Sequence, residues 1–235
     1  MLFPNSDPLE IDKFSMMAEE WWNAKGPCKP LHDINPTRLA FIKSLVPFLQ
    51  EQKIIDIGCG GGLLTEELAV AKTQVTGIDK SDTLIKIARR HAQQNGLIIN
   101  YLTEDAETLS KKQREYFDFA CCMELLEHVP DPASLIKACG DLVKPNGWLF
   151  FSTINRTTYA YLAAIIGAEY LLKLLPQGTH HYEKFIRPSE LASVARKLGF
   201  KLKKLKGIHY NPFTRSAALT NSIRINYIAA FQKET

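Results

Sequence analysis

The feature that most restricts the fold of this chain is a glycine cluster that directly follows a short apolar stretch. Residues 53–57 (KIIDI) are typical of a buried strand, and Gly58, Gly60, Gly61 and Gly62 follow within five positions. Apolar residues then recur with helical spacing over 63–71. A strand, a glycine turn and a helix in this order predict an α/β fold that binds its ligand at the carboxyl edge of the sheet.

Short apolar runs and helical segments continue to alternate along the chain. We predict further strands at 74–79, 98–102, 117–123 and 147–153, and helices at 81–94, 132–143 and 188–198. This order predicts a mostly parallel, twisted sheet with helices on both faces, which is a Rossmann-like α/β fold. Residues 200–208 and 223–232 are predicted to be strands with no helix between them. We therefore expect the sheet to end in a C-terminal antiparallel pair.

Length and composition fit one such unit. The 235 residues are enough for one α/β domain, and 46% hydrophobic with 23% charged residues is ordinary for a globular protein. We predict a single domain over 1–235, with an N-terminal helical cap at 9–50 and an apolar insertion at about 157–187. Breaks in the cap are expected at residues 26–30 and at Asn35-Pro36.

Charge and cysteine usage exclude several classes of function. A net charge of +4 is too small to require a nucleic-acid partner. The five cysteines lack the paired spacing of a zinc site and indicate reduced thiols, as in a cytoplasmic protein. The first residues lack the pattern of a secretory signal, and no apolar run reaches the length of a spanning helix.

The glycine loop differs from a dinucleotide fingerprint, because Leu63 stands where the third glycine of G-x-G-x-x-G belongs. Asp56 precedes the loop, and its carboxylate suits a ligand with an ammonium group better than a pyrophosphate. Asp79 ends the second strand, where an acidic side chain can bind ribose hydroxyls; capping the next helix is the alternative. Asp105 follows the third strand and is a candidate for the adenine amino group or for a solvated turn.

A D-x-G-x-G-x-G loop with an acidic end to the second strand resembles the class I S-adenosylmethionine-dependent methyltransferases. Longer segments are similar to one family within that class, the ubiquinone biosynthesis O-methyltransferases. These segments cover much of the chain: WWNAKGPCKPLHDINPTR (21–38), CMELLEHVPDP (122–132), VKPNGWLFFSTINR (143–156), GAEYLLKLLPQGTHHYEKFIRPSEL (167–191) and IHYNPFTR (208–215).

The resemblance implies transfer of the S-adenosylmethionine methyl group to phenolic or catechol hydroxyls of polyprenylated ubiquinone precursors. These are 2-polyprenyl-6-hydroxyphenol and 3-demethylubiquinol. It also implies that Arg38 contacts the cofactor carboxylate, that Gly58, with Gly60 beside it, lies under the methionine part, and that Met123 lies beside the adenosine. Without the resemblance, Arg38 would be interpreted as a surface charge and Met123 as a core residue.

Glu124, Glu127 and His128 follow the fourth strand and form the candidate catalytic cluster. Two carboxylates and an imidazole can hold a hard divalent ion, with Mg²⁺ expected from the resemblance. Such an ion would lower the pKa of a phenol, which is ordinarily near 10. His128 as a general base, with His180 and His181 as further candidates, and an acidic helix start with a capping histidine are the alternatives.

The run YAYLAAIIGAEYLLKLL (159–175) is nearly apolar and fits either a buried helix or a segment that docks on a bilayer. Because the expected substrates carry a polyprenyl tail, we predict peripheral attachment to the inner face of the membrane, with a ubiquinone biosynthetic assembly as a candidate partner. The basic run 201–206 fits a solvated strand or contact with anionic lipid. Trp21 and Trp22 fit either a cover over the active site or packing.

Two other classes of function remain open. The first is a methyltransferase for another small molecule or for RNA, although the chain shows no platform of base-stacking aromatic residues beside a basic groove. The second is a non-catalytic scaffold that binds the cofactor, which would have no need of Glu124, Glu127 and His128.

Overall fold

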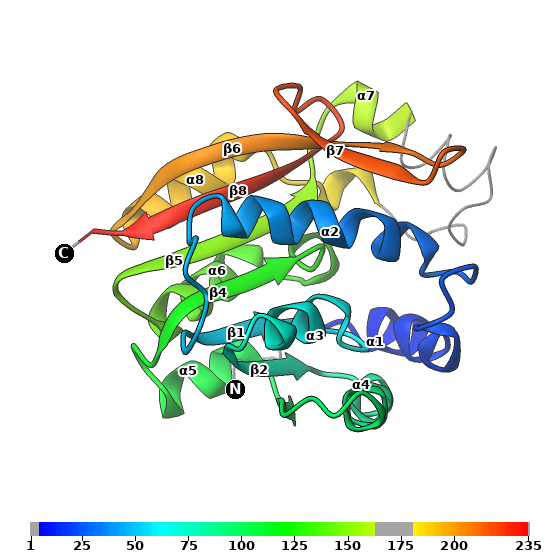
Figure 1. Cartoon of the computed structure of the whole chain (residues 1–235). Coiled ribbons are helices and arrows are strands. Elements are labelled where there is room, and N and C mark those ends of the chain that lie inside the picture. Colours follow the sequence, from blue (N-terminus) through cyan, green and yellow to red (C-terminus); the bar gives the residue numbers. More distant parts are fainter. Residues whose placement is uncertain (1–4, 163–180, 235) are drawn as a thin grey trace.

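The computed structural model describes residues 5–162 and 181–234. Its centre is an eight-stranded sheet in the order β3-β2-β1-β4-β5-β8-β6-β7, which runs from the bottom to the top of Figure 1. The pairs from β3 through β5 are parallel, and those from β5 through β7 are antiparallel. The strand bounds are β1 Lys53–Ile57, β2 Gln74–Asp79, β3 Asn100–Thr103, β4 Phe117–Met123, β5 Val143–Ile154, β6 Phe200–Asn211, β7 Ser216–Thr220 and β8 Asn226–Lys233.

Helices cover both faces of this sheet, so the predicted Rossmann-like class is confirmed. In Figure 1, α2 crosses one face, and α6 and α8 lie against the other. The described helices are α1 Pro8–Ser15, α2 Lys29–Lys43, α3 Leu63–Val70, α4 Asp82–Gln94, α5 Ala106–Lys112, α6 Pro132–Leu142, α7 Thr158–Ala160 and α8 Pro188–Lys197, with short 3₁₀ turns η1 Ala18–Glu20, η2 Leu126–His128 and η4 Tyr182–Lys184.

Two apolar layers hold the helices against the sheet. On one face, Leu109, Leu135 and Leu191 of three different helices pack with Phe151 and Phe231 of the sheet. The other layer is built on aromatic rings, because Phe150 meets Phe41 of α2 and Phe119 of β4 edge to face. Strand β4 contributes to both layers, which is why its residues 119–123 form an unbroken apolar run.

The C-terminal antiparallel pair is confirmed, with an addition that the sequence analysis missed. Strand β8 lies between β5 and β6, and β7 forms a hairpin with β6 that packs on α2. Thr37 of α2 donates a hydrogen bond to the Ala217 carbonyl of β7 (3.1 Å). The five residues of β7 include no fully buried side chain, so they lack the apolar pattern that predicts a strand.

Three local predictions were wrong. Pro36 does not break the helical cap but lies inside α2. Beside it, Asn35 donates from Nδ2 to the Leu63 carbonyl (3.0 Å) and anchors α2 on α3. Helix α5 was not predicted, because it has only seven residues. Strand β3 begins at Asn100 and not at residue 98, because Ile98 is 96% exposed and contributes nothing to the core.

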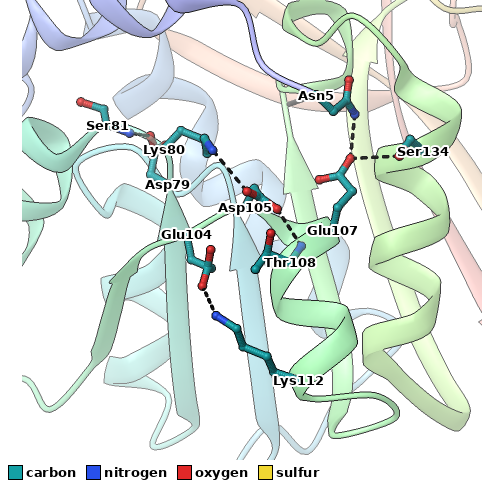
Figure 2. A network of polar contacts seen from close by, with 10 residues as sticks. All are labelled: Asn5, Asp79, Lys80, Ser81, Glu104, Asp105, Glu107, Thr108, Lys112 and Ser134. Atoms are coloured by element: carbon teal, nitrogen blue, oxygen red, sulfur yellow. Dashed lines mark hydrogen bonds and ion pairs between the residues drawn. The ribbon is translucent and has the colours of Figure 1, made fainter. Parts of the chain in front are cut away.

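Residues 5–24, called here the N-terminal strap, lie over segments that follow the carboxyl ends of β1, β2, β3 and β4. Asn5 donates to Glu107 of α5 (2.7 Å), as Figure 2 shows, and Ser15 is 2.6 Å from Ser81, the N-cap of α4. Glu19 pairs with Arg90 (2.9 Å). These contacts are polar, and helix α1 has no fully buried residue.

Only the beginning and end of the predicted apolar insertion are described. Tyr159, Tyr161 and Leu162 are 41–58% exposed, and residues 163–180, which include most of the proposed membrane segment and His180, lie outside the described residues. No helix in residues 5–162 and 181–234 has the length and apolar character needed to cross a membrane. His181 is described and exposed.

Candidate active site

The glycine loop joins β1 to α3 at the carboxyl edge of the sheet. Gly58, Gly60 and Gly62 have φ angles of +70°, +55° and +95°, which an L side chain rarely adopts. The amide nitrogens of Gly58 and Cys59 both donate to the carbonyl of Ile78 in β2 (2.9 and 3.0 Å). The loop is therefore fixed to the neighbouring strand by its own backbone.

The space beside each glycine is filled by a side chain of the protein. A Cβ on Gly58 would lie 2.7 Å from Leu125, and one on Gly60 or Gly61 would lie 2.3 Å from the ring of Trp21. A Cβ on Gly62 would lie 2.3 Å from the hydroxyl of Tyr101. That these glycines make room for a ligand stays a prediction; the structure shows that Leu125, Trp21 and Tyr101 pack closely around the loop.

Asp79 stands at the end of β2, beside this loop. Its Oδ2 accepts the amide N–H of Gly60 (3.0 Å) and its Oδ1 accepts that of Ser81 (2.8 Å). Burial raises the pKa of Asp79, opposed by these backbone hydrogen bonds. The side chain links the loop to the start of α4, and Ser81 serves as the N-cap of that helix by accepting from Leu84.

Asp56 lies beneath the loop and is almost completely buried. Thr65 of α3 donates a 2.6 Å hydrogen bond to its Oδ2. Burial raises the pKa of Asp56 from 3.8 to about 6, which the Thr65 hydrogen bond and the charge of Arg38 oppose. The ionised carboxylate is therefore short of compensating positive charge.

Arg38 reaches the site from α2 and is 5% exposed. Its guanidinium nitrogen Nη2 lies 3.2 Å from Oε1 of Glu124, but the geometry is not that of a hydrogen bond. Neither Nε nor Nη2 has a hydrogen-bond partner among the described residues. Buried donors without partners are uncommon. Arg38 thus presents N–H groups that an anionic group could satisfy.

Asp105 caps α5, and Figure 2 shows the surrounding network. Its Oδ1 accepts the Thr108 amide (2.6 Å), and its Oδ2 pairs with Lys80 (3.2 Å). These contacts hold the pKa of Asp105 below its ordinary value although burial raises it. Both oxygens have partners, so the assignment of Asp105 to an adenine amino group stays a prediction. Met123 ends β4 and is 8% exposed.

Glu124, Glu127 and His128 follow β4, but their side chains contact different partners. Glu124, at a φ of +51°, accepts from Ser152 (2.7 Å), and Oε2 of Glu127 accepts from Thr153 (2.8 Å). Oε1 of Glu127 is buried with no hydrogen-bond partner in the described residues. Burial, together with the charge of Glu124, raises the pKa of Glu127 to about 7.

His128 is directed to the N-terminal strap. Its Nδ1 donates to Oε2 of Glu10 (2.8 Å), and its ring meets Phe14 edge to face at 5.0 Å. This hydrogen bond lowers the pKa of Glu10. Because a carboxylate only accepts, the contact places a proton on Nδ1. Glu10 was not predicted as part of the site, since it lies 118 positions from His128 and no local spacing links the two.

Within residues 5–162 and 181–234, no three His, Cys, Asp or Glu side chains are gathered as a metal ligand set. The expected trio of Glu124, Glu127 and His128 is adjacent in sequence but divided among Ser152, Thr153 and Glu10. The five cysteines are buried as free thiols, as predicted.

Comparison with known proteins places the chain among methyltransferases. Residues 32–205 match a family model described as a methyltransferase domain. The chain is 50% identical to the ubiquinone biosynthesis O-methyltransferase of Nitrosomonas europaea over 97% of both chains. It is 48% identical to that of Ralstonia nicotianae over 98% of this chain and 97% of the relative.

Solved structures share the fold at lower identity. A magnesium protoporphyrin IX methyltransferase from Synechocystis PCC 6803, solved with bound S-adenosylmethionine, superposes with a TM-score of 0.67 at 16% identity, over 99% of this chain and 100% of that one. The sequence relatives are similar over nearly their whole length. The chain therefore belongs to the ubiquinone biosynthesis O-methyltransferase family of S-adenosylmethionine-dependent methyltransferases.

Proposed function

We propose that this protein transfers the methyl group of S-adenosylmethionine to phenolic hydroxyls of polyprenylated ubiquinone precursors, namely 2-polyprenyl-6-hydroxyphenol and 3-demethylubiquinol. The observation that carries the proposal is the near full-length similarity to ubiquinone biosynthesis O-methyltransferases. The glycine loop, Asp79 and Arg38 also lie at one edge of the sheet, as such an activity requires.

The described residues fit the cofactor. The unpartnered N–H groups of Arg38 suit its methionine carboxylate, and the buried Asp56 lacks the positive charge that an ammonium group would supply. Asp79 would bind the ribose hydroxyls, because its two carboxylate oxygens can accept further hydrogen bonds beside those from the Gly60 and Ser81 amides. Gly58 and Gly60 would lie under the methionine part, Met123 beside the adenosine and Asp105 at the adenine.

The bound cofactor supplies a methyl group on a sulfonium, which is already activated for displacement. In the transfer, the bond from sulfur to the methyl carbon breaks as the bond from the phenolic oxygen forms, and a neutral thioether leaves. The phenolic proton must go to a base at the carboxyl edge. We assign this role to His128, which Glu10 holds in one orientation, and the protein contributes mainly by aligning the reacting atoms.

A divalent metal is the other way to deprotonate the substrate. Glu124, Glu127 and His128 do not fit a metal in their present arrangement, because each would have to leave its partner to form a common site. No step is therefore assigned to a metal, and Mg²⁺ dependence is tested below.

We also propose that the segment 159–175 docks on the membrane surface, so that the ring of the substrate reaches the site while its tail stays in the bilayer. The exposed Tyr159, Tyr161 and Leu162 at the beginning of the segment support this. Liposome flotation tests it: deletion of residues 159–178 should abolish binding, and unchanged binding would contradict the proposal.

The function is tested by transfer of labelled methyl from S-adenosylmethionine to a short-tailed demethylubiquinol, after chelation and again with Mg²⁺ restored. Transfer under both conditions supports the reaction with His128 as base, and the H128Q variant should then lose it. Transfer only with Mg²⁺ would show that the three side chains rearrange around a metal. No transfer in either condition, with cofactor binding intact, would favour another small-molecule acceptor or a scaffold.

A further inference from the structure

Trp21 and Trp22 of the N-terminal strap contact the glycine loop from two sides, and the pair is called here the tryptophan clamp. The ring of Trp21 lies where the Cβ atoms of Gly60 and Gly61 would be, 2.3 Å from each position. Trp22 donates from its Nε1 to the carbonyl of Gly61 (2.9 Å). The sheet holds the start of the loop, whereas these two side chains hold its middle.

Both tryptophans are themselves fixed. The ring of Trp22 stacks flat on His91 of α4, with 3.5 Å between ring centroids and 8° between planes. Nδ1 of His91 lies 2.9 Å from both carboxylate oxygens of Glu66, on the helix that the glycine loop begins. The carbonyl of Trp21 is 2.8 Å from Nε2 of His32. The arrangement thus connects α2, α3 and α4 to the loop through the strap.

One polar atom of these two tryptophans has no hydrogen-bond partner within the part of the chain that the structure describes. Nε1 of Trp21 is buried without a hydrogen-bond acceptor among the described residues, and the whole residue is only 6% exposed. It lies 2.9 Å from the position of a Cβ on Gly61, so it faces the loop. A buried indole N–H usually has an acceptor. Arg38, at the same edge of the sheet, likewise has buried N–H groups without partners.

We propose that Trp21 binds the cofactor, donating from Nε1 to its methionine carboxylate, and that Trp22 is a positioning residue that holds the loop through Gly61. The proposal rests on the proposed function only in taking S-adenosylmethionine as the ligand. A neutral donor on the strap then complements the charged donors of Arg38, and the strap encloses the cofactor from the side opposite the sheet.

Binding measurements without turnover test this on the full-length protein. Isothermal titration calorimetry compares S-adenosylhomocysteine, which keeps the amino-acid carboxylate, with 5′-methylthioadenosine, which lacks it. W21F should weaken S-adenosylhomocysteine binding by about tenfold, the effect of losing one hydrogen bond to a charged group. It should change 5′-methylthioadenosine binding less than twofold.

W22F should weaken both ligands, because the loop itself is displaced. W148F is the matched control: Trp148 stacks on Phe150 in the middle of β5 and has no contact with the glycine loop among those described, so this variant should bind both ligands like wild type. H91Q provides a second route to the clamp, since it removes the ring under Trp22 without touching the loop, and should reproduce part of the W22F effect. Thermal unfolding of each variant confirms that it is folded.

The outcomes separate the two proposals. If W21F binds S-adenosylhomocysteine as W148F does, or weakens both ligands equally, the contact with the carboxylate is refuted. If W22F and H91Q leave binding unchanged, the positioning role of Trp22 is refuted. Failure of the wild type to bind S-adenosylhomocysteine would instead refute the cofactor assignment on which the proposed function depends.

Discussion

The buried carboxylate of Asp56 should give the stability of this protein a distinctive dependence on pH. Its pKa is 3.8 in an exposed chain and about 6 in the folded protein, because burial disfavours the ionised form. The folded state therefore binds this proton more tightly than the unfolded state. It follows that the contribution of Asp56 to the free energy of unfolding is full below pH 3.8 and falls as the pH rises to about 6.

The rise in pKa corresponds to about 3 kcal/mol between the protonated and ionised forms. Between pH 4.5 and pH 7.5, the loss is about 2 kcal/mol, since part of the titration lies below pH 4.5. The Asp56→Asn variant keeps an acceptor for the 2.6 Å hydrogen bond from Thr65 but cannot ionise. The free energy of unfolding of the wild type should thus decline by about 2 kcal/mol relative to the variant across this range.

Urea unfolding of both proteins at intervals between pH 4.5 and pH 7.5 measures this difference. All other titrating groups are shared, so the difference between the two curves isolates Asp56. Thr65→Val is the control: it removes a hydrogen bond that lowers the pKa of Asp56 and should move the decline to higher pH. Parallel curves for the wild type and Asp56→Asn would refute the reasoning, because they would show that the carboxyl has the same pKa in both states.

Three further perturbations follow from the packing. Gly62→Ala should lower the free energy of unfolding in urea by about 3 kcal/mol, because φ is +95° and the added Cβ meets the Tyr101 hydroxyl at 2.3 Å. The loss should be smaller in a Tyr101→Phe background, and an equal loss in both backgrounds would contradict the clash. By the same assay, Phe150→Ala should lower the free energy of unfolding by about 4 kcal/mol, since the ring is fully buried and meets Phe41 and Phe119. A loss below about 1 kcal/mol would contradict the central place of Phe150 in the core. Asp105→Ala should lower the free energy of unfolding by about 1 kcal/mol, because it removes the cap of α5, whereas Asp105→Asn should keep the cap. Equal stabilities of the two variants would argue against a capping role for Asp105.

Most of the parallel half of the fold could be predicted from the sequence, because each buried strand is an apolar run and each turn is marked by glycine or a cap. Ser81 is an example, since a serine before a helical run is a local signal and does cap α4. The β6–β7 hairpin lacks such a signal: β7 has no buried side chain, and its stability depends on α2, which is distant in the sequence.

The candidate site was predictable only where its residues share a local motif. Gly58, Gly60 and Asp79 follow from the order of strand, loop and strand, and the structure brings them together. The contacts of Glu10 and of the two tryptophans are long-range and leave no periodic pattern in the sequence. Adjacency was also misleading, because Glu124, Glu127 and His128 are neighbours in the chain but contact two different elements: the first two contact β5, and His128 contacts α1.

The position of β8 has a consequence for how the chain folds as it is made. Strand β8 lies between β5 and β6, yet it is synthesised after every other strand of the sheet. While β8 is still inside the ribosome, β5 has an unpaired edge and β6 lacks the neighbour that attaches it to the parallel half. That nascent intermediate exposes an apolar strand edge, the kind of surface that favours aggregation and binds chaperones. Ribosome stalling before residue 226 would hold the protein in its most vulnerable state.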